Sequence, residues 1–158
     1  MSEIWLQNEW VEQSRRILTS YKKWLGEDLL KDLAEDDVER ARQLYFTDRV
    51  VVSHDTSPDP LINYGNQKCL NLWETTPDQL IGMPSRKTAE PMHRDERARM
   101  LEQTTKNGYF SDYKGIRISS KGSRFFIHQA TIWNLLDGEG KPAGQAATFS
   151  EWTFLDKE

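Results

Sequence analysis

The chain has 158 residues, which is enough for one domain with a substantial hydrophobic core. Hydrophobic residues make up 37% and charged residues 29%, a balance typical of globular rather than disordered proteins. The net charge of −4, with acids and bases interspersed, argues against direct nucleic-acid binding, and no apolar run is long enough to span a membrane. The single cysteine and the lack of a signal-peptide pattern lead us to expect a cytoplasmic protein.

The first third of the sequence has a helical pattern. Apolar and small side chains recur at three- and four-residue steps between residues 10 and 25, and Gly26 follows them as a helix stop. A second helical piece is predicted over residues 29–33, and the acidic residues 35–37 are typical of the start of a third helix that ends near residue 45. We therefore assign residues 1–47 to an N-terminal helical extension.

The large apolar side chains of this extension allow two interpretations. Either the extension packs on its own domain, or it forms a helix pair in a homodimer, which is the assembly that we expect. In the second case the candidate dimer interface consists of Trp5, Trp10, Ile17, Tyr21 and Trp24.

The residues from 48 to 152 predict a sheet that is interrupted by helices. Two strands, at 50–54 and 61–64, are followed by short helices that begin near Asn66 and Pro77 and by a helix from about 93 to 106. Three strands follow between 111 and 152, and residues 153–158 are expected to be a tail. This order predicts an α+β fold: a five-stranded antiparallel sheet forms a cup with helices on one face.

Several segments of this region resemble a PAS domain, namely 62–66 (INYGN), 77–82 (PDQLIG), 93–97 (HRDER) and 122–125 (GSRF). More specifically, the sequence resembles the MEKHLA family over residues 16–152, through 63–66 (NYGN), 72–74 (LWE), 83–91 (MPSRKTAEP), 117–120 (RISS), 130–134 (ATIWN) and 144–149 (GQAATF). That family has a PAS-like domain. It occurs as a free-standing bacterial protein, the form expected here, and at the C-terminus of plant class III homeodomain-leucine-zipper transcription factors. The resemblance implies a sensory or regulatory domain, and it implies no ligand and no catalytic activity.

The cup contains a candidate ligand pocket, and its most polar wall is the segment 83–91. Arg86 suits a carboxylate or a phosphate because its guanidinium group can donate two parallel hydrogen bonds. Alternatively, Arg86 pairs with Glu90 or another acid and only holds the segment in place. The candidate pocket residues are Trp73, Met83, Ser85, Arg86, Thr88, Ile116, Ile118, His128, Trp133, Asn134 and Gln145.

The indole and amide side chains in this set have alternative roles. Core packing is the expected role of Trp73 and Trp133, and stacking on a ligand is the alternative. Asn134 is unusual within a strand, so a buried Asn134 needs polar partners, which Gln145 on the neighbouring strand can supply. Such an amide pair can also hold the polar edge of a ligand.

The sequence identifies no cofactor and no metal site. In flavin-binding photoreceptor PAS domains a reactive cysteine follows a Gly-x-x pattern, and here Ser85 stands at that position, so flavin adduct chemistry is not expected. Cys69 is predicted to be a buried, inert thiol. The spacing of His54, His93 and His128 predicts no metal site, and haem with one of them as its ligand is only a weak alternative.

The sequence shows no catalytic residue and no enzyme motif. The leading hypothesis is a cytoplasmic PAS-like sensory domain that binds a small molecule in the cup and signals through contacts with an unidentified protein partner. One alternative is a ligand-free interaction or dimerisation module with a core filled by its own side chains. The other alternative is a small enzyme acting in the same pocket, which a site formed by Arg86, His128 and Asn134 would favour.

Overall fold

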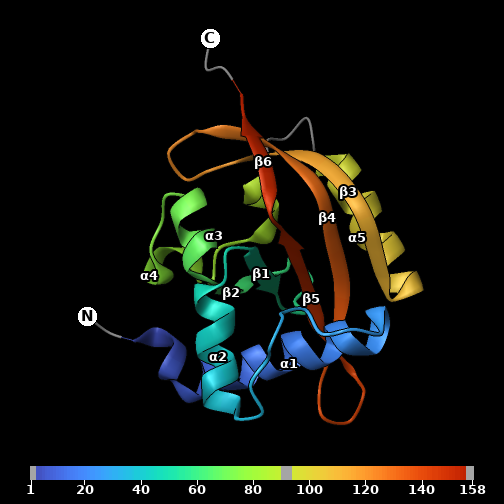
Figure 1. Ribbon diagram of the computed structural model, residues 1–158. Helices are drawn as coiled ribbons and strands as arrows, with labels where there is room; N and C mark the ends of the chain where they lie inside the picture. Colours follow the sequence, from blue (N-terminus) through green and yellow to red (C-terminus); the bar gives the residue numbers. More distant parts are fainter. Residues whose placement is uncertain (1–2, 90–93, 156–158) are drawn as a thin grey trace.

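The fold is an antiparallel sheet with helices packed against it (Figure 1). The computed structural model describes residues 3–89 and 94–155. The strands are β1 Val50–His54, β2 Ile62–Gly65, β3 Tyr109–Ile118, β4 Arg124–Leu136, β5 Pro142–Phe149 and β6 Glu151–Phe154. The helices are η1 Ile4–Leu6, α1 Asn8–Leu25, α2 Asp37–Phe46, α3 Gln67–Leu72, α4 Pro77–Leu80, η2 Ser85–Thr88 and α5 Arg94–Asn107. The predicted α+β class is confirmed, while residue 93, where the last helix was expected to start, lies outside the described residues.

The sheet has the strand order β2-β1-β5-β4-β3, and β6 pairs with β4. All pairings are antiparallel, so β5 lies between the first strand and the long hairpin of β3 and β4. Val52 pairs with Ala147, which in turn pairs with Ile132, so these three side chains lie side by side on one face. That face is the inside of the cup.

The end of the sheet differs from the prediction of one closing strand and a tail from residue 153. The last strand breaks at Ser150, and the chain continues as β6, in which Thr153 pairs with Phe126 and Phe154 with Phe125. The sheet therefore has six strands, and the first two residues of the predicted tail belong to it. Residues 156–158 lie outside the described part of the chain.

The short helices of the cup are held to the sheet by Asn66, which is fully buried. Its Oδ1 accepts hydrogen bonds from the backbone N–H groups of Val51 (3.0 Å) and Cys69 (3.1 Å). Its Nδ2 donates to the carbonyl oxygens of Leu44 (3.1 Å) and Arg49 (2.8 Å). One side chain thus caps α3, as the sequence predicts, and also joins it to α2 and β1.

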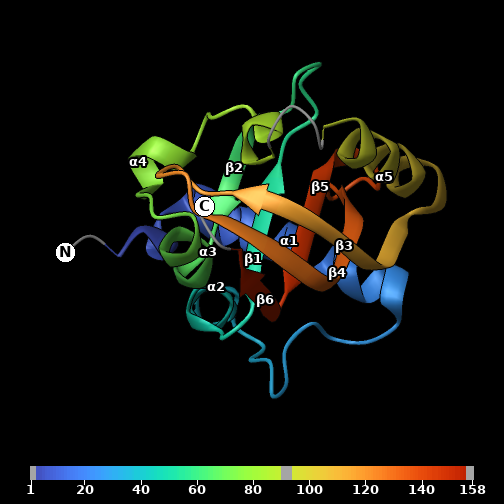
Figure 2. The ribbon, with the colours of Figure 1, turned by 90° about the horizontal axis from the view of Figure 1, so that it is seen from above.

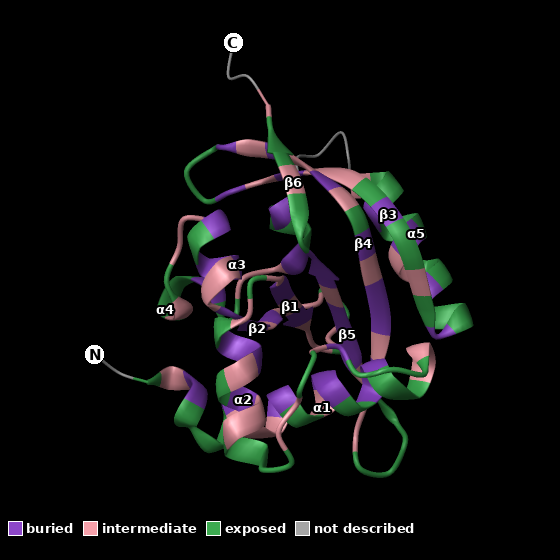
Figure 3. Cartoon of the chain, viewed as in Figure 1, coloured by how far each residue is buried: buried purple, intermediate pink, exposed green. Residues whose placement is uncertain are grey.

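Helix α1 of the N-terminal extension lies on the second face of the sheet, opposite the cup, and α2 packs against α1 (Figure 2). Trp133 on β4 donates a hydrogen bond from Nε1 to the carbonyl oxygen of Ile17 (3.3 Å), and its ring meets Tyr21 edge-on with the centroids 4.9 Å apart. Trp10 contacts Tyr64 on β2 with the same centroid separation. The buried stripe of α1 therefore faces its own sheet (Figure 3).

This packing corrects the candidate dimer interface. Four of its five members are buried inside the chain, and the fifth is half-buried and donates from its indole nitrogen to the carbonyl oxygen of Asn134 at 2.9 Å. Side chains that are already covered within their own chain offer little surface to a second copy. The set concerned is Trp5, Trp10, Ile17, Tyr21 and Trp24. The homodimer itself stays a prediction, and it requires other residues.

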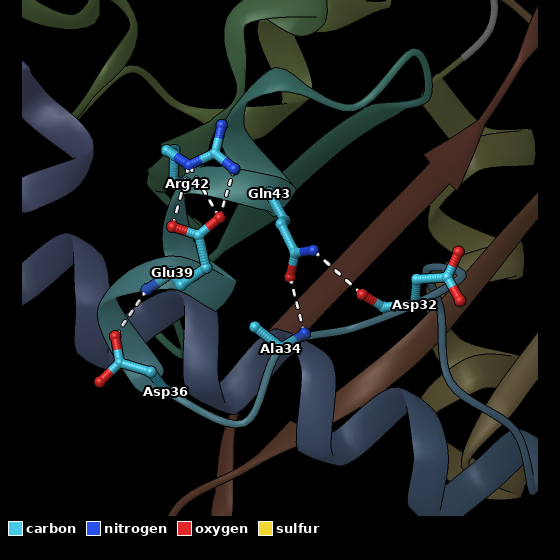
Figure 4. Close-up of polar contacts among 6 residues, drawn as sticks. All are labelled: Asp32, Ala34, Asp36, Glu39, Arg42 and Gln43. Atoms are coloured by element: carbon cyan, nitrogen blue, oxygen red, sulfur yellow. Dashed lines mark hydrogen bonds and ion pairs between the residues drawn. The ribbon is translucent and has the colours of Figure 1, made fainter.

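The segment between α1 and α2 is irregular, so the helical piece predicted over residues 29–33 is wrong. Gln43 on α2 holds this segment, because its Oε1 accepts from the backbone N–H of Ala34 (2.9 Å) and its Nε2 donates to the carbonyl oxygen of Asp32 (3.1 Å; Figure 4). Asp36 caps α2 as predicted, since its Oδ2 accepts from the backbone N–H of Glu39 at 3.0 Å. Side-chain hydrogen bonds to the backbone thus replace a helix here.

Candidate functional site

A cavity of about 80 Å³ lies in the cup, between the inner face of the sheet and the helices η2 and α5. Its apolar wall comes from alternate residues of the central strands, namely Ile132 and Ala130 on β4 and Ala147 and Phe149 on β5. Ala147 is small, and this agrees with the expectation that the small side chains of the last strand leave space above the sheet.

Two buried arginines form the polar part of the same cavity. Arg97 on α5 and Arg117 on β3 are each only 7% exposed and both line it. Arg97 donates from Nη2 to Ser85 Oγ, and Arg117 donates from Nη1 to the carbonyl oxygen of Ile116 at 3.0 Å. A guanidinium group has five N–H donors, so each arginine keeps most of its donors free of these bonds.

The two guanidinium groups affect each other electrostatically. The pKa of Arg97 is lowered to about 10. Burial is the largest cause, and the positive charge of Arg117 is the second. Among the described residues, Asp59 is the carboxylate that acts on Arg97, and it is already paired with Arg86 at 3.2 Å. No described carboxylate forms an ion pair with Arg97 or Arg117. The cavity therefore holds two cations that have no ion-pair partner among the described residues.

Arg117 lies beside Tyr113, a residue of β3 at which the pairing with β4 is irregular. The register of β3 shifts on both sides of Tyr113, and this aromatic ring lies in the cavity wall with the Arg117 guanidinium carbon 5.3 Å from its centroid. Gly115 is required there, because a Cβ at this position would stand 2.4 Å from the Tyr113 hydroxyl oxygen. Tyr113 and Arg117 are four residues apart, so the ordinary alternation of side chains along β3 places the aromatic ring and the guanidinium group on the same side of the strand.

Two further cavity residues have buried polar atoms without a hydrogen-bond partner among the described residues, namely His54 Nε2 and Trp73 Nε1. The Nδ1 of His54 is 3.1 Å from the carbonyl oxygen of Asp55 and must donate to it, so neutral His54 presents a lone pair at Nε2. Burial is the largest effect on the pKa of His54, and it lowers this pKa. The hydrogen bond to the Asp55 carbonyl oxygen raises the pKa by a smaller amount, and the repulsion of Arg97 lowers it further. The neutral form of His54 is therefore favoured. The cavity thus offers one unused acceptor and one unused donor besides the arginines.

Four of the predicted pocket residues line this cavity: Trp73, Ser85, Thr88 and Gln145. Asn134 borders a neighbouring surface hollow, and Gln145 donates to its Oδ1 at 3.0 Å, so the predicted amide partnership is present. Gln145 also donates to the Leu101 carbonyl oxygen (3.1 Å), while Asn134 donates to that of Thr104 (2.9 Å). The amide pair therefore ties α5 to the sheet.

The other predicted residues lie elsewhere. Met83 and Ile118 line a smaller hollow beside Trp73, and Ile116 lines none of these hollows. Arg86 is exposed and pairs with Asp59, which agrees with the alternative of a loop contact, while Glu90 lies outside the described residues. His128 bonds to Thr153 Oγ1 on β6 at 2.8 Å.

These placements bear on the enzyme and cofactor hypotheses. Arg86, His128 and Asn134 do not meet, so the site that would have favoured an enzyme is not formed. Cys69 is fully buried outside the cavity, and burial raises its thiol pKa to about 12, so its thiolate is disfavoured. A cavity of about 80 Å³ is far smaller than the roughly 300–1,000 Å³ of pockets for drug-sized ligands, so it does not have room for a flavin ring system or a haem.

Sequence reasoning missed Arg97, Arg117, His54 and Tyr113. Arg97 stands in a run of charged residues that is typical of a solvated helix face, and its burial comes from packing against η2 and β3. A cluster of three or more metal-ligating side chains is absent from the described residues, and none of the helices in that part of the chain is long and apolar enough to cross a membrane.

The sequence of this chain matches the model of the MEKHLA domain over residues 11–154. The chain belongs to the MEKHLA family. Curated proteins similar to it include the homeobox-leucine zipper protein ATHB-15 of Arabidopsis thaliana, 23% identical over 90% of this chain, and HOX29 of Oryza sativa subsp. japonica, 24% identical over 89%. The MEKHLA chain spans about a sixth (17%) of the length of either relative. These relatives are plant proteins, so the expected free-standing bacterial form stays a prediction.

Solved structures establish the PAS-like fold of this MEKHLA domain. A PAS domain from Colwellia psychrerythraea superposes with a TM-score of 0.63 and 15% identity, covering 76% of this chain and 97% of that one. A light-oxygen-voltage domain studied with a flavin analogue gives a TM-score of 0.58 and 21% identity over 78% and 87% of the two chains. At these identities the likeness shows a shared fold and carries no ligand across.

Proposed function

We infer that this MEKHLA domain is a cytoplasmic sensory or regulatory module that binds a small molecule in the cup and passes the signal on through protein–protein contacts. The observation that carries this proposal is the cavity of about 80 Å³, which combines an apolar strand face with buried polar atoms that lack partners. An unpaired buried donor or acceptor costs roughly 1–3 kcal/mol. A ligand with complementary groups removes that cost, so the domain is stabilised when the ligand binds.

The route from the cavity to the surface begins at α5. This helix forms one wall of the cavity, and it is tied to the sheet by the hydrogen bonds of Gln145 and Asn134. Trp24 of α1 donates to the backbone carbonyl of the same Asn134 on the other face. A ligand that shifts α5 therefore acts on a residue that both helices contact, which supports a path toward the N-terminal extension.

A cavity-filling substitution tests this proposal. In Ala147→Leu the added methyl groups occupy the cavity, so a ligand should no longer raise the thermal unfolding midpoint. Ala143→Leu, on the same strand but outside the cavity lining, is the matched control. Native mass spectrometry of the purified protein and a thermal-shift screen with neutral, cationic and anionic metabolites provide the ligands.

The expected result is at least one compound that stabilises the wild type and Ala143→Leu but not Ala147→Leu. If no compound stabilises the wild type and its mass is that of the bare chain, the ligand-binding proposal fails. The ligand-free interaction module would then be the better hypothesis. The small size of the cavity favours this second candidate, because pockets for drug-sized ligands usually measure roughly 300–1,000 Å³.

A further inference from the structure

The chemical class of the ligand follows from the groups that surround the cavity. Arg97 and Arg117 are cations that lie almost entirely out of water and have no described carboxylate as an ion-pair partner. Buried charges in proteins are normally paired, because an unpaired ion loses its hydration without compensation. Among the residues that the structure describes, the site therefore lacks an anion, which a ligand can supply.

We propose that Arg97 and Arg117 bind the carboxylate of a small organic acid whose carbon chain lies against the apolar strand face of the cavity; this inference rests on the ligand-binding function proposed above. The guanidinium group matches a carboxylate because two of its N–H bonds point at the two oxygens in parallel. The repulsion between the two arginines contributes to the lowered pKa of Arg97. An anion bound between them offsets this repulsion, so the lowered pKa is consistent with the arrangement.

The rest of the cavity restricts the acid further. Ile132, Ala147 and Phe149 offer only carbon surface, which excludes a ligand as uniformly polar as inorganic phosphate. A volume of about 80 Å³ is far below that of pockets for drug-sized ligands, so the acid is short. His54 Nε2 has a free lone pair, so a hydroxyl group on the ligand gains a buried hydrogen bond there.

Four probe compounds of similar size separate these features. Butyrate and 2-hydroxybutyrate carry the carboxylate, butyramide has the same shape without the charge, and inorganic phosphate has the charge without the carbon chain. We expect both acids to bind the wild-type protein in calorimetry, the hydroxy acid more tightly. Butyramide and phosphate should each bind at least about tenfold more weakly, because the first loses the charge-assisted bonds and the second loses the apolar contact.

The arginines are tested with the variants Arg97→Met and Arg117→Met, and Arg86→Met is the matched control. Replacing a buried, unpaired charge by an apolar side chain of similar length should leave the ligand-free protein as stable as the wild type or more stable. The two cavity variants should nevertheless lose the thermal shift caused by 2-hydroxybutyrate. Arg86 is exposed and bonded to Asp59, so Arg86→Met should keep the shift.

The variants Arg97→Lys and Arg117→Lys cover the case in which the methionine variants do not fold. They keep the charge but lose the two-pronged geometry, so we expect at least about tenfold weaker binding of butyrate. The inference is overturned if butyramide binds as tightly as butyrate, or if both acids bind equally well to the wild type and the cavity variants. It is also overturned if neither acid binds.

The failure of this inference can be told apart from failure of the proposed function. If neutral or cationic compounds stabilise the wild type and Ala143→Leu, but not Ala147→Leu, while the acids have no effect, the cavity binds ligands of another class. In that case the ligand-binding function stands and the carboxylate inference falls. If phosphate alone binds, and needs both arginines, the site recognises an inorganic anion and the organic-acid inference is wrong.

Discussion

Asn66 is the residue on which the arrangement of the cup most depends, because its amide makes four hydrogen bonds to the backbone of three elements and the segment before β1. In Asn66→Ala the backbone N–H groups of Val51 and Cys69 lose their partner in a buried site. We expect the free energy of unfolding to fall by roughly 2–4 kcal/mol. The measurement is the urea unfolding midpoint. Asn71→Ala, at an exposed position on the same helix, should change it by less than about 0.5 kcal/mol.

His54 makes stability depend on pH in one direction. Burial lowers its pKa in the folded protein, so the unfolded chain takes up the proton first as the pH falls. The contribution of neutral His54 is therefore present in full above about pH 6.5, and it is lost as the pH falls through the folded-state pKa. The urea midpoint of the wild type should drop between pH 7.5 and pH 5 more than that of His54→Gln. Equal slopes for the wild type and His54→Gln would show that His54 does not carry the effect.

At the scale of single residues, the sequence identified the polar segment of η2 but not the cations opposite it. Ser85 and Thr88 stood out because polar residues lie there between two prolines. Arg117 was missed because its apolar neighbours Ile116 and Ile118 were assigned to the cup, whereas the structure turns the opposite face of β3, with Tyr113 and Arg117, toward the cavity. Which side chain of this strand faces the cup is decided by its pairing with β4.

Among the elements, α1 is the one whose role the structure corrects most. The sequence showed the apolar stripe of this helix correctly but not its partner, because a stripe packs equally well on a second copy or on its own sheet. If α1 formed a dimer, a polar residue at Ile17 would give a folded monomer. The structure places Ile17 at 0% exposure beneath the sheet, and so it predicts another outcome.

We expect Ile17→Asp to lower the free energy of unfolding by about 3 kcal/mol or more, because it buries an unpaired carboxylate. Circular dichroism during thermal unfolding measures the loss. Val38→Asp is the control: this side chain is exposed in the first turn of α2, where an acidic residue favours the helix. A folded Ile17→Asp protein with an unchanged unfolding midpoint would contradict the packing of α1.

For the whole molecule, the sheet and its cup follow from the sequence, while the surface through which a signal leaves does not. The order of strands and helices, the hairpin turns and the caps at Asn66 and Thr76 are local signals, so they are visible in one sequence. A partner surface is made of side chains from distant segments. The exposed Phe46 at the end of α2, for example, contacts Trp5 of η1, the short helix that also carries the exposed Leu6.

This pair of exposed side chains gives the predicted homodimer a surface that α1 cannot offer. Phe46 is 52% exposed and Leu6 45%, and both belong to the N-terminal extension. If the chain dimerises through the extension, Phe46→Glu should shift the molar mass measured by light scattering from that of two chains to that of one. Its stability should change little, since half of the side chain already faces water.

Phe154→Glu, which changes an exposed aromatic residue on β6, is the matched control and should leave the dimer intact. Loss of the dimer in Phe154→Glu alone would place the interface along β6, whose residues pair with β4. A wild-type protein with the molar mass of one chain at all concentrations would show that the homodimer prediction is wrong. Signalling through the extension would then require a different protein as the partner of Phe46.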